Sequence, residues 1–185
     1  TEEVNIPLTE AQQAVYEPIQ EAMNSHVHKT YLLHGVTGSG KTQLYLRATA
    51  KCISQDKTAI ILVPEIILTD QIVKRFVETF GDEVVVFHSK LTVQQRNNNW
   101  ERLRRKDSHI IIGARSAVFA PAEDIGLIVV DEEHDTSYKQ EDMVRYHARN
   151  VALWRAEAHG CPVILGSATP SVTSYYKAKQ GDYYL

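Results

Sequence analysis

The sequence has few cysteines, and this shortage excludes two classes of small-protein scaffold. Among 185 residues there are two cysteines, Cys52 and Cys161, which lie far apart in the sequence and lack metal-ligand spacing. Two isolated cysteines exclude a disulfide framework and a zinc cluster in this segment, and they suit a reducing cytosol.

The sequence also lacks an excess of basic charge and a long apolar run. The formal net charge is −3 and the isoelectric point is about 6.2. No general positive field therefore attracts nucleic acid, and any contact with it must be local. No apolar run approaches the ~20 residues of a membrane span, and no signal peptide opens the chain. The chain starts at Thr1 and stops abruptly at Leu185, so we expect a piece of a longer protein.

What is present is a chain that is 43% hydrophobic and long enough to bury one core. Short apolar segments alternate with helix-like segments. The predicted strands are residues 30–34, 57–63, 84–87, 109–113, 127–130 and 162–166, and the predicted helices are residues 8–24, 43–54, 69–80, 92–106, 144–159 and 171–179. Strands that are apolar throughout and alternate with helices favour a parallel sheet covered on both faces. We therefore expect a three-layer α/β fold with ligands at the carboxyl ends of the strands.

Residues 35–42 fit the phosphate-binding pattern G-x-x-x-x-G-K-[ST]; they are Gly35, Val36, Thr37, Gly38, Ser39, Gly40, Lys41 and Thr42. A predicted strand precedes them and a predicted helix follows, which is the context such a loop requires. Glycines let backbone N–H groups turn toward an anion, and the helix N-terminus adds partial positive charge. Lys41 would act at the β- and γ-phosphates, and the Thr42 hydroxyl would bind Mg²⁺.

Acidic residues follow the predicted strand at 127–130, as in a Walker B pattern. Asp131 would hold Mg²⁺, usually through water. Glu132 could orient and deprotonate the water that attacks the γ-phosphate, which favours a nucleotide hydrolase over a small-molecule kinase. The alternative is an ordinary acidic loop after a strand. His134 either couples this site to its surroundings or is a solvated loop histidine.

Two further segments have both a structural and a functional interpretation. Residues 166–171 read GSATPS, in which Ser167 and Thr169 could sense the γ-phosphate while Ser171 caps the next helix. Thr9 and Gln12 form a capping box at the start of the first predicted helix, and Pro18 predicts a kink or break within it.

The phosphate loop, the DEEH segment and the S-A-T segment together resemble the first motor lobe of a superfamily 2 helicase. Six stretches narrow the resemblance to one family: LVPEIILTDQ at 62–71, VFHS at 86–89, GARSAVF at 113–119, DEEHDTSYKQ at 131–140, RYHAR at 145–149 and GSATPS at 166–171. They closely resemble the family of primosomal protein N′, the bacterial PriA replication-restart helicases. The resemblance covers residues 8–185, with residues 1–7 as a lead-in.

This resemblance implies a RecA-like P-loop NTPase lobe from an ATP-dependent helicase that moves 3′→5′ on single-stranded DNA at stalled or branched forks. The implied cofactors are ATP and Mg²⁺, with zinc only in a part of the protein outside this chain. The implied partners are forked and single-stranded DNA, a second motor lobe, primosome and replicative-helicase-loading proteins, and single-stranded DNA-binding protein. The implied location is the bacterial cytoplasm, at forks in the nucleoid, without a membrane partner.

The resemblance also assigns residues. Gln12 would read adenine, beside its capping role. DNA binding or its coupling to hydrolysis would fall to Thr69, Gln71, Arg115, Ser116, His134, Tyr138, Lys139, Arg145, Tyr146, Ser167 and Thr169. An arginine at a strand end suits a phosphate oxygen, although Arg115 could instead form a surface ion pair. Tyrosines among cations suit stacking on unpaired bases, although each could simply pack locally.

The basic helix at 92–106 could touch DNA, but such a run is more often a solvated face, with Trp100 and Leu103 turned inward. Two other functions stay open for the chain. One is a nucleic-acid-stimulated superfamily 2 ATPase or translocase without a restart role. The other is a non-catalytic scaffold lobe, against which the intact phosphate loop and acidic pair argue.

Overall fold

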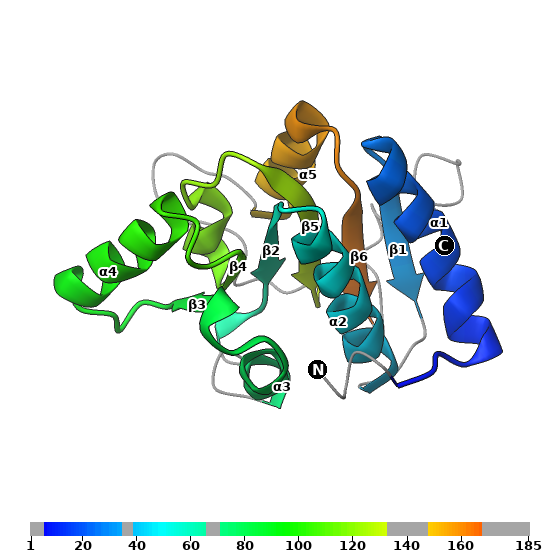
Figure 1. The fold of residues 1–185 in the computed structure, drawn as a ribbon, viewed down its shortest axis with the longest axis horizontal. Helices are drawn as coiled ribbons and strands as arrows, with labels where there is room; N and C mark the ends of the chain where they lie inside the picture. The colour runs from blue at the N-terminus through cyan, green and yellow to red at the C-terminus, as the bar shows by residue number, and fades with distance from the viewer. Residues whose placement is uncertain (1–5, 35–38, 66–70, 133–147, 168–185) are drawn as a thin grey trace.

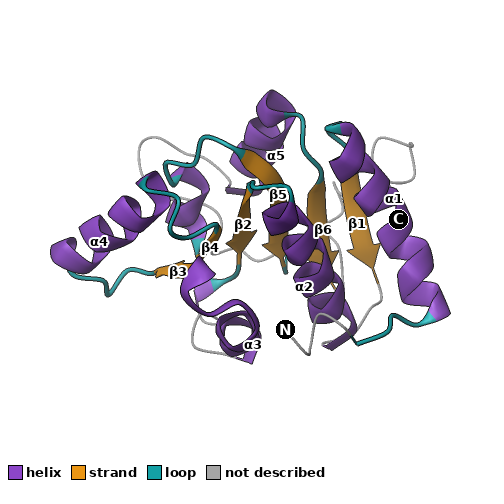
Figure 2. Cartoon of the chain, viewed as in Figure 1, coloured by secondary structure: helices purple, strands orange, loops and turns teal. Residues whose placement is uncertain are grey.

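Six parallel strands form one sheet with helices on both of its faces (Figures 1 and 2). The computed structural model describes residues 6–34, 39–65, 71–132 and 148–167. The strands are β1 (Thr30–His34), β2 (Thr58–Leu62), β3 (Val84–Phe87), β4 (Ile110–Gly113), β5 (Ile125–Asp131) and β6 (Val163–Ser167). Their order in the sheet is β1-β6-β5-β2-β4-β3, and the pairs are parallel. The predicted parallel α/β architecture is confirmed.

Two buried clusters, one on each face of the sheet, define the three layers. The helices are α1 (Glu10–Ser25), α2 (Ser39–Ser54), α3 (Gln71–Phe80), α4 (Val93–Arg104) and α5 (Ala148–His159), with short 3₁₀ helices η3 (Gly81–Glu83) and η4 (Arg115–Phe119). Side chains of α1, α2 and α3 pack with Ile61, whereas those of α4, η4 and α5 pack with Ile60. Neighbouring strand residues enter opposite clusters because successive side chains of a strand point to opposite faces.

The strand register brings the carboxyl ends of the strands to one edge of the sheet. His34 of β1 lies opposite Ser167 of β6, and Asp131 of β5 lies opposite Gly166. β2 and β4 continue the same alignment on the other side of β5: Leu62, the last residue of β2, pairs with Gly113 at the end of β4 and with Val130, the residue before Asp131. This edge, which we call the carboxyl edge, is therefore where the segments predicted to carry chemistry begin.

The predicted capping box of α1 is confirmed, but a break at Pro18 is wrong. The Gln12 N–H donates to Thr9 Oγ1 (3.1 Å), and Gln12 Oε1 accepts from the Thr9 N–H (2.9 Å). α1 continues through Pro18, whose carbonyl accepts a hydrogen bond from the Tyr31 hydroxyl (2.9 Å). The buried side of the helix, which includes Ile19 and Met23, holds it against the core, so packing outweighs the lost backbone hydrogen bond.

Two other local predictions needed correction. α2 begins at Ser39 rather than at residue 43, because the helix starts inside the glycine-containing loop, where helix propensity gives no signal. On α4, Leu103 is buried as predicted, but Trp100 is 45% exposed. α4 lies beside the edge strand β3 (Figure 1) and buries one residue, Leu103, so it has room for only a shallow contact with the sheet. In the described part of the chain, no helix has the length and apolarity needed to cross a membrane.

Candidate nucleotide-binding site

The lysine of the phosphate loop and the two predicted acidic residues meet at the carboxyl edge. Lys41 lies in the first turn of α2 and is 4% exposed. Its Nζ lies 2.6 Å from Glu132 Oε1 and 3.3 Å from Asp131 Oδ1. Lys41 and Asp131, which are 90 positions apart in the sequence, are buried and form one charge cluster with the partly buried Glu132.

Glu132 reaches Lys41 because the backbone turns sharply at the end of β5. Consecutive residues of a strand point to opposite faces, so a continued strand would separate the two carboxylates. Instead Glu132 lies just beyond β5 with a φ of 47°, in the left-handed region. A non-glycine residue there costs about 1–3 kcal/mol, and such strain is concentrated at functional sites. The turn sets both carboxylates beside one ammonium group.

The charges of this cluster stabilise one another against burial. Burial alone would lower the pKa of Lys41, but Asp131 and Glu132 together raise that pKa above its ordinary value. Burial and the Glu132 carboxylate raise the pKa of Asp131 above its ordinary value, and the Lys41 ammonium and the Tyr45 hydroxyl oppose only part of this rise. Lys41 is therefore a firmly charged cation at neutral pH, which is the property that a phosphate-binding lysine needs.

The donor set fits a magnesium–nucleotide. The Lys41 ammonium and the N-terminus of α2 supply positive charge for phosphate oxygens. The Asp131 carboxylate and the Thr42 hydroxyl are the hard oxygen ligands that Mg²⁺ prefers. Thr42 follows Lys41 on α2 and is partly buried. These roles were predicted from the sequence and stay predictions; the geometry brings Lys41, Asp131 and Glu132 together as they require.

Tyr45 belongs to this site although sequence analysis did not select it. It is fully buried, and its hydroxyl donates to Asp131 Oδ1 (2.8 Å). The available signal was spacing: Tyr45 follows Lys41 by four residues, so both lie on one face of α2. An aromatic residue among Leu44 and Leu46 reads as core, which concealed the polar contact.

Other predicted residues occupy the same edge or its neighbourhood. Ser167 ends β6 and is fully buried. Ser39 opens α2, and Gly40 is its second residue. The Gln12 side chain is engaged in the capping box of α1, which leaves its adenine role a prediction.

The described residues predicted to contact DNA follow β2 and β4. Gln71 is the first residue of α3 and is exposed. Arg115 and Ser116 open η4, immediately after β4, and Ser116 is exposed. Arg115 and Ser116 thus follow the end of β4 at the carboxyl edge. Their contact with DNA stays a prediction.

Several predicted residues lie outside the described part of the chain: Gly35, Val36, Thr37, Gly38, Thr69, His134, Tyr138, Lys139, Arg145, Tyr146 and Thr169. The basic helix α4 is described, and three of the five lysines and arginines in residues 92–106 pair with an acid. Arg104 Nη2 lies 2.8 Å from Glu101 Oε2, and Lys106 Nζ lies 3.2 Å from Asp124 Oδ2, all on exposed side chains. This favours a solvated face for α4.

Known proteins share this sequence over most of its length. The DEAD/DEAH box helicase family matches residues 9–177. The chain is 53% identical over 180 residues to the replication restart protein PriA of Bacillus subtilis (strain 168), covering 97% of this chain and 22% of that protein. It is 46% identical over 175 residues to PriA of Chlamydia pneumoniae, covering 94% of this chain and 23% of that protein. The chain thus spans about a fifth of the length of these relatives.

Solved structures agree on the fold. RecG bound to a three-way DNA junction matches with a TM-score of 0.70 and 24% identity, covering 96% of this chain and 23% of RecG. The DEAD-box helicase Mss116 bound to ssRNA and UDP-BeF matches with a TM-score of 0.63 and 19% identity, covering 93% of this chain and 38% of Mss116. The RecA-like P-loop NTPase fold predicted from the resemblance is confirmed. The chain belongs to the DEAD/DEAH box helicase family of superfamily 2, as a helicase lobe whose sequence is similar to that of the PriA proteins.

Proposed function

We propose that this chain is the first motor lobe of an ATP-dependent DNA helicase that moves 3′→5′ and acts at stalled or branched forks in primosome assembly and replication restart. One observation carries the catalytic part of the proposal: the buried Lys41 ammonium lies between Asp131 and Glu132 at the N-terminus of α2. The likeness to PriA over nearly the whole chain supports the biological part.

The residues of the cluster divide the chemistry among them. Lys41 and backbone N–H groups at the N-terminus of α2 bind the β- and γ-phosphates. Thr42 and Asp131 hold Mg²⁺, which when bound neutralises charge that develops on the transferred phosphoryl group. Glu132 orients the attacking water and accepts its proton. Gln12, at the start of α1, contacts adenine.

DNA lies along the carboxyl edge in this proposal. Thr69, Gln71, Arg115 and Ser116 contact its backbone. Coupling between DNA and the nucleotide falls to the remaining predicted residues, which are His134, Tyr138, Lys139, Arg145, Tyr146, Ser167 and Thr169. RecG, whose fold matches, was solved on a three-way DNA junction, which is consistent with branched DNA as the substrate class.

A second lobe of the same protein completes the site with an arginine finger, which is worth about 10³–10⁵ in rate in related NTPases. The isolated chain therefore binds nucleotide weakly, hydrolyses little and unwinds nothing. The whole protein meets single-stranded DNA-binding protein, primosome proteins and helicase-loading proteins at forks in the bacterial cytoplasm. Strong DNA-stimulated ATP hydrolysis by this chain alone would contradict the proposal that a second lobe is needed to complete the site.

The test uses the full-length protein that contains this chain. ATP hydrolysis is measured without DNA, with a linear duplex and with a forked duplex, and strand release is followed on partial duplexes with either a 3′ or a 5′ single-stranded arm. We expect forked DNA to stimulate hydrolysis most, with release requiring the 3′ arm as the loading strand. Equal hydrolysis with every DNA would remove the restart role, and hydrolysis without strand release would indicate a translocase.

A further inference from the structure

We propose that Tyr45 is a positioning residue, whose hydroxyl holds the Asp131 carboxylate in place for the magnesium–nucleotide, and that Gly166 provides the space that this hydroxyl needs. The inference rests on the proposed function, because it concerns the same site. It adds a residue outside the phosphate loop and the Walker B segment to the machinery that binds Mg²⁺.

Two donors from one face of α2 converge on a single oxygen of Asp131. The Tyr45 hydroxyl donates to Oδ1 at 2.8 Å, and Lys41 Nζ lies 3.3 Å from the same atom. Hydrogen bonds to an ionised acceptor are roughly twice as strong as neutral ones. Because Tyr45 is fully buried and its ring is rigid, its hydroxyl is a fixed point against which the carboxylate is oriented.

Gly166 on β6 pairs with Asp131 on β5, and because it has no side chain the Tyr45 hydroxyl can occupy the space beside it. A Cβ at position 166 would lie 1.7 Å from Tyr45 Oη, 3.0 Å from Tyr45 Cζ and 3.2 Å from Asp131 Oδ1. In protein structures a Cβ atom essentially never lies within 3.0 Å of a heavy atom to which it is not bonded. Any side chain at 166 would therefore require the Tyr45 hydroxyl to shift away from the carboxylate.

Packing alone does not account for the hydroxyl. A phenylalanine ring would fill the same apolar space between α2 and the sheet, without a polar atom that must be matched inside the core. Instead the oxygen of Tyr45 is paired with a carboxylate, and the strand beside it carries glycine where the oxygen lies. Tyr45 thereby connects three elements of the site: α2, which follows the phosphate loop, β5, which ends at Asp131, and β6, which ends at Ser167.

The test is Tyr45→Phe in the full-length protein, with Mg²⁺-dependent binding of a fluorescent, non-hydrolysable ATP analogue as its main readout. We expect binding in EDTA to stay within twofold of wild type. The ratio of the affinity in Mg²⁺ to the affinity in EDTA should shrink about 3- to 10-fold, which corresponds to the loss of one hydrogen bond of ordinary net strength. ATP hydrolysis should need correspondingly more Mg²⁺ to reach half its maximum.

Tyr31→Phe is the matched control. Tyr31 is also buried, and its hydroxyl donates to the Pro18 carbonyl at 2.9 Å, away from Lys41 and Asp131. The control makes the same chemical change and should lower the melting temperature without altering the Mg²⁺ dependence. If Tyr45→Phe likewise changed only the melting temperature, the positioning role would be wrong.

Gly166→Ala supplies an independent route to the same interaction. Alone, it should reduce Mg²⁺-dependent tightening at least as much as Tyr45→Phe, because it displaces the hydroxyl. When Tyr45→Phe is added to Gly166→Ala, the Mg²⁺-dependent tightening of nucleotide binding should fall by less than a further twofold. If Gly166→Ala fails to fold, the comparison of the two tyrosine variants decides the matter. A wild-type protein that neither binds nor hydrolyses ATP would overturn the proposed function itself, whereas an active wild type with a normal Tyr45→Phe variant would overturn this inference alone.

Discussion

The two ends of the sheet use charge in opposite ways. At the carboxyl edge, Lys41 and Asp131 are buried, Glu132 has a left-handed backbone, and a glycine makes room for a tyrosine hydroxyl. These are features that lower the stability of a fold and are retained at sites that bind or react. In the proposed function a ligand binds at the carboxyl edge, and the ion pairs of Lys41 hold the charges there until it does.

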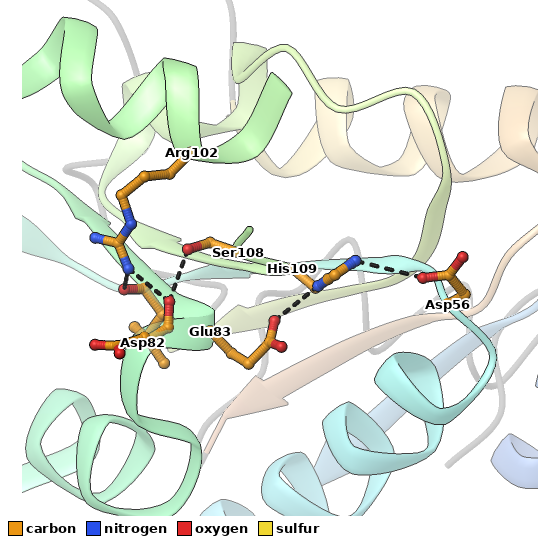
Figure 3. A network of polar contacts seen from close by, with 7 residues as sticks. Asp56, Asp82, Glu83, Arg102, Ser108 and His109 are labelled. Carbon is orange, nitrogen blue, oxygen red and sulfur yellow. Dashed lines mark hydrogen bonds and ion pairs between the residues drawn. The ribbon is translucent and has the colours of Figure 1, made fainter. Parts of the chain in front are cut away.

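At the amino end, polar side chains tie together the loops that lead into β2, β3 and β4 (Figure 3). Arg102 Nη2 donates to the carbonyls of Asp82 (2.5 Å) and Val84 (3.4 Å), and Ser108 Oγ donates to the same Asp82 carbonyl (2.7 Å). His109 Nδ1 lies 2.7 Å from Glu83 Oε2.

Most of these acceptors are backbone carbonyls at the ends of elements, which would otherwise lack partners. On the far side of the His109 ring, Nε2 lies 3.5 Å from Asp56 Oδ1, an ion-pair distance rather than a hydrogen bond. The two ends of the sheet therefore differ in what their polar side chains contact. At the carboxyl edge a buried lysine faces two carboxylates, whereas at the amino end Arg102 and Ser108 donate to backbone carbonyls and fix the loops.

The largest expected effect comes from Glu132→Gln at the carboxyl edge. The amide keeps the size of the side chain and its contact with Lys41 but cannot accept a proton from water. In the full-length protein we expect DNA-stimulated ATP hydrolysis to fall by about 10²–10⁴-fold, with nucleotide affinity within a few-fold of wild type. Steady-state hydrolysis and equilibrium binding, measured side by side, check this. Equal losses in both would mean that Glu132 serves binding rather than catalysis.

An intermediate effect is expected from Arg102→Ala at the amino end. The variant leaves two carbonyls of the α3–β3 turn without their guanidinium donor, and we expect the free energy of unfolding to fall by about 1–3 kcal/mol. ATP hydrolysis at a temperature where the variant is folded should stay within twofold of wild type. Chemical denaturation of both proteins measures the first quantity.

The control for Arg102 lies on the same helix. Arg104 is exposed and pairs with Glu101 in solvent, so Arg104→Ala should leave the denaturation midpoint unchanged. If the two arginine variants were equally stable, the amino-end network would not be a structural tie.

The smallest expected effect is the reaction of the two thiols. Cys52 is on α2, and its side chain lies beside Gly126 near the start of β5; Cys161 lies just before β6. Both thiols are buried. Burial raises the pKa of each thiol to about 12. At pH 8 about one thiol in 10⁴ is then a thiolate, the reactive form. We expect no alkylation by iodoacetamide in the folded protein and full alkylation after unfolding. Rapid labelling of these two cysteines at pH 8 would show that the amino end opens readily.

Much of the fold was predictable because its signals are local. Apolar runs such as that at β2 mark buried parallel strands, and the capping box at Thr9 marks the start of α1. The phosphate loop and the acidic pair were predictable for the same reason, since each is one continuous segment with a fixed spacing.

What the sequence could not reveal depends on contacts between distant segments. The strand order, with β6 between β1 and β5, has no local signature. The left-handed turn that brings Glu132 to Lys41 joins segments far apart in the sequence, and the role of Tyr45 depends on a glycine on another strand. The exposure of Trp100 reflects the position of α4 beside an edge strand, which no helical periodicity encodes.

The most direct test of this account is fork-stimulated ATP hydrolysis by the full-length protein carrying Lys41→Ala, with Arg102→Ala measured beside it. The account predicts that Lys41→Ala loses at least about 100-fold in hydrolysis, because it removes the buried charge that would meet the phosphates. Arg102→Ala should stay within twofold of wild type. Hydrolysis by Lys41→Ala at the wild-type rate would contradict the assignment of the carboxyl edge as the motor's nucleotide site.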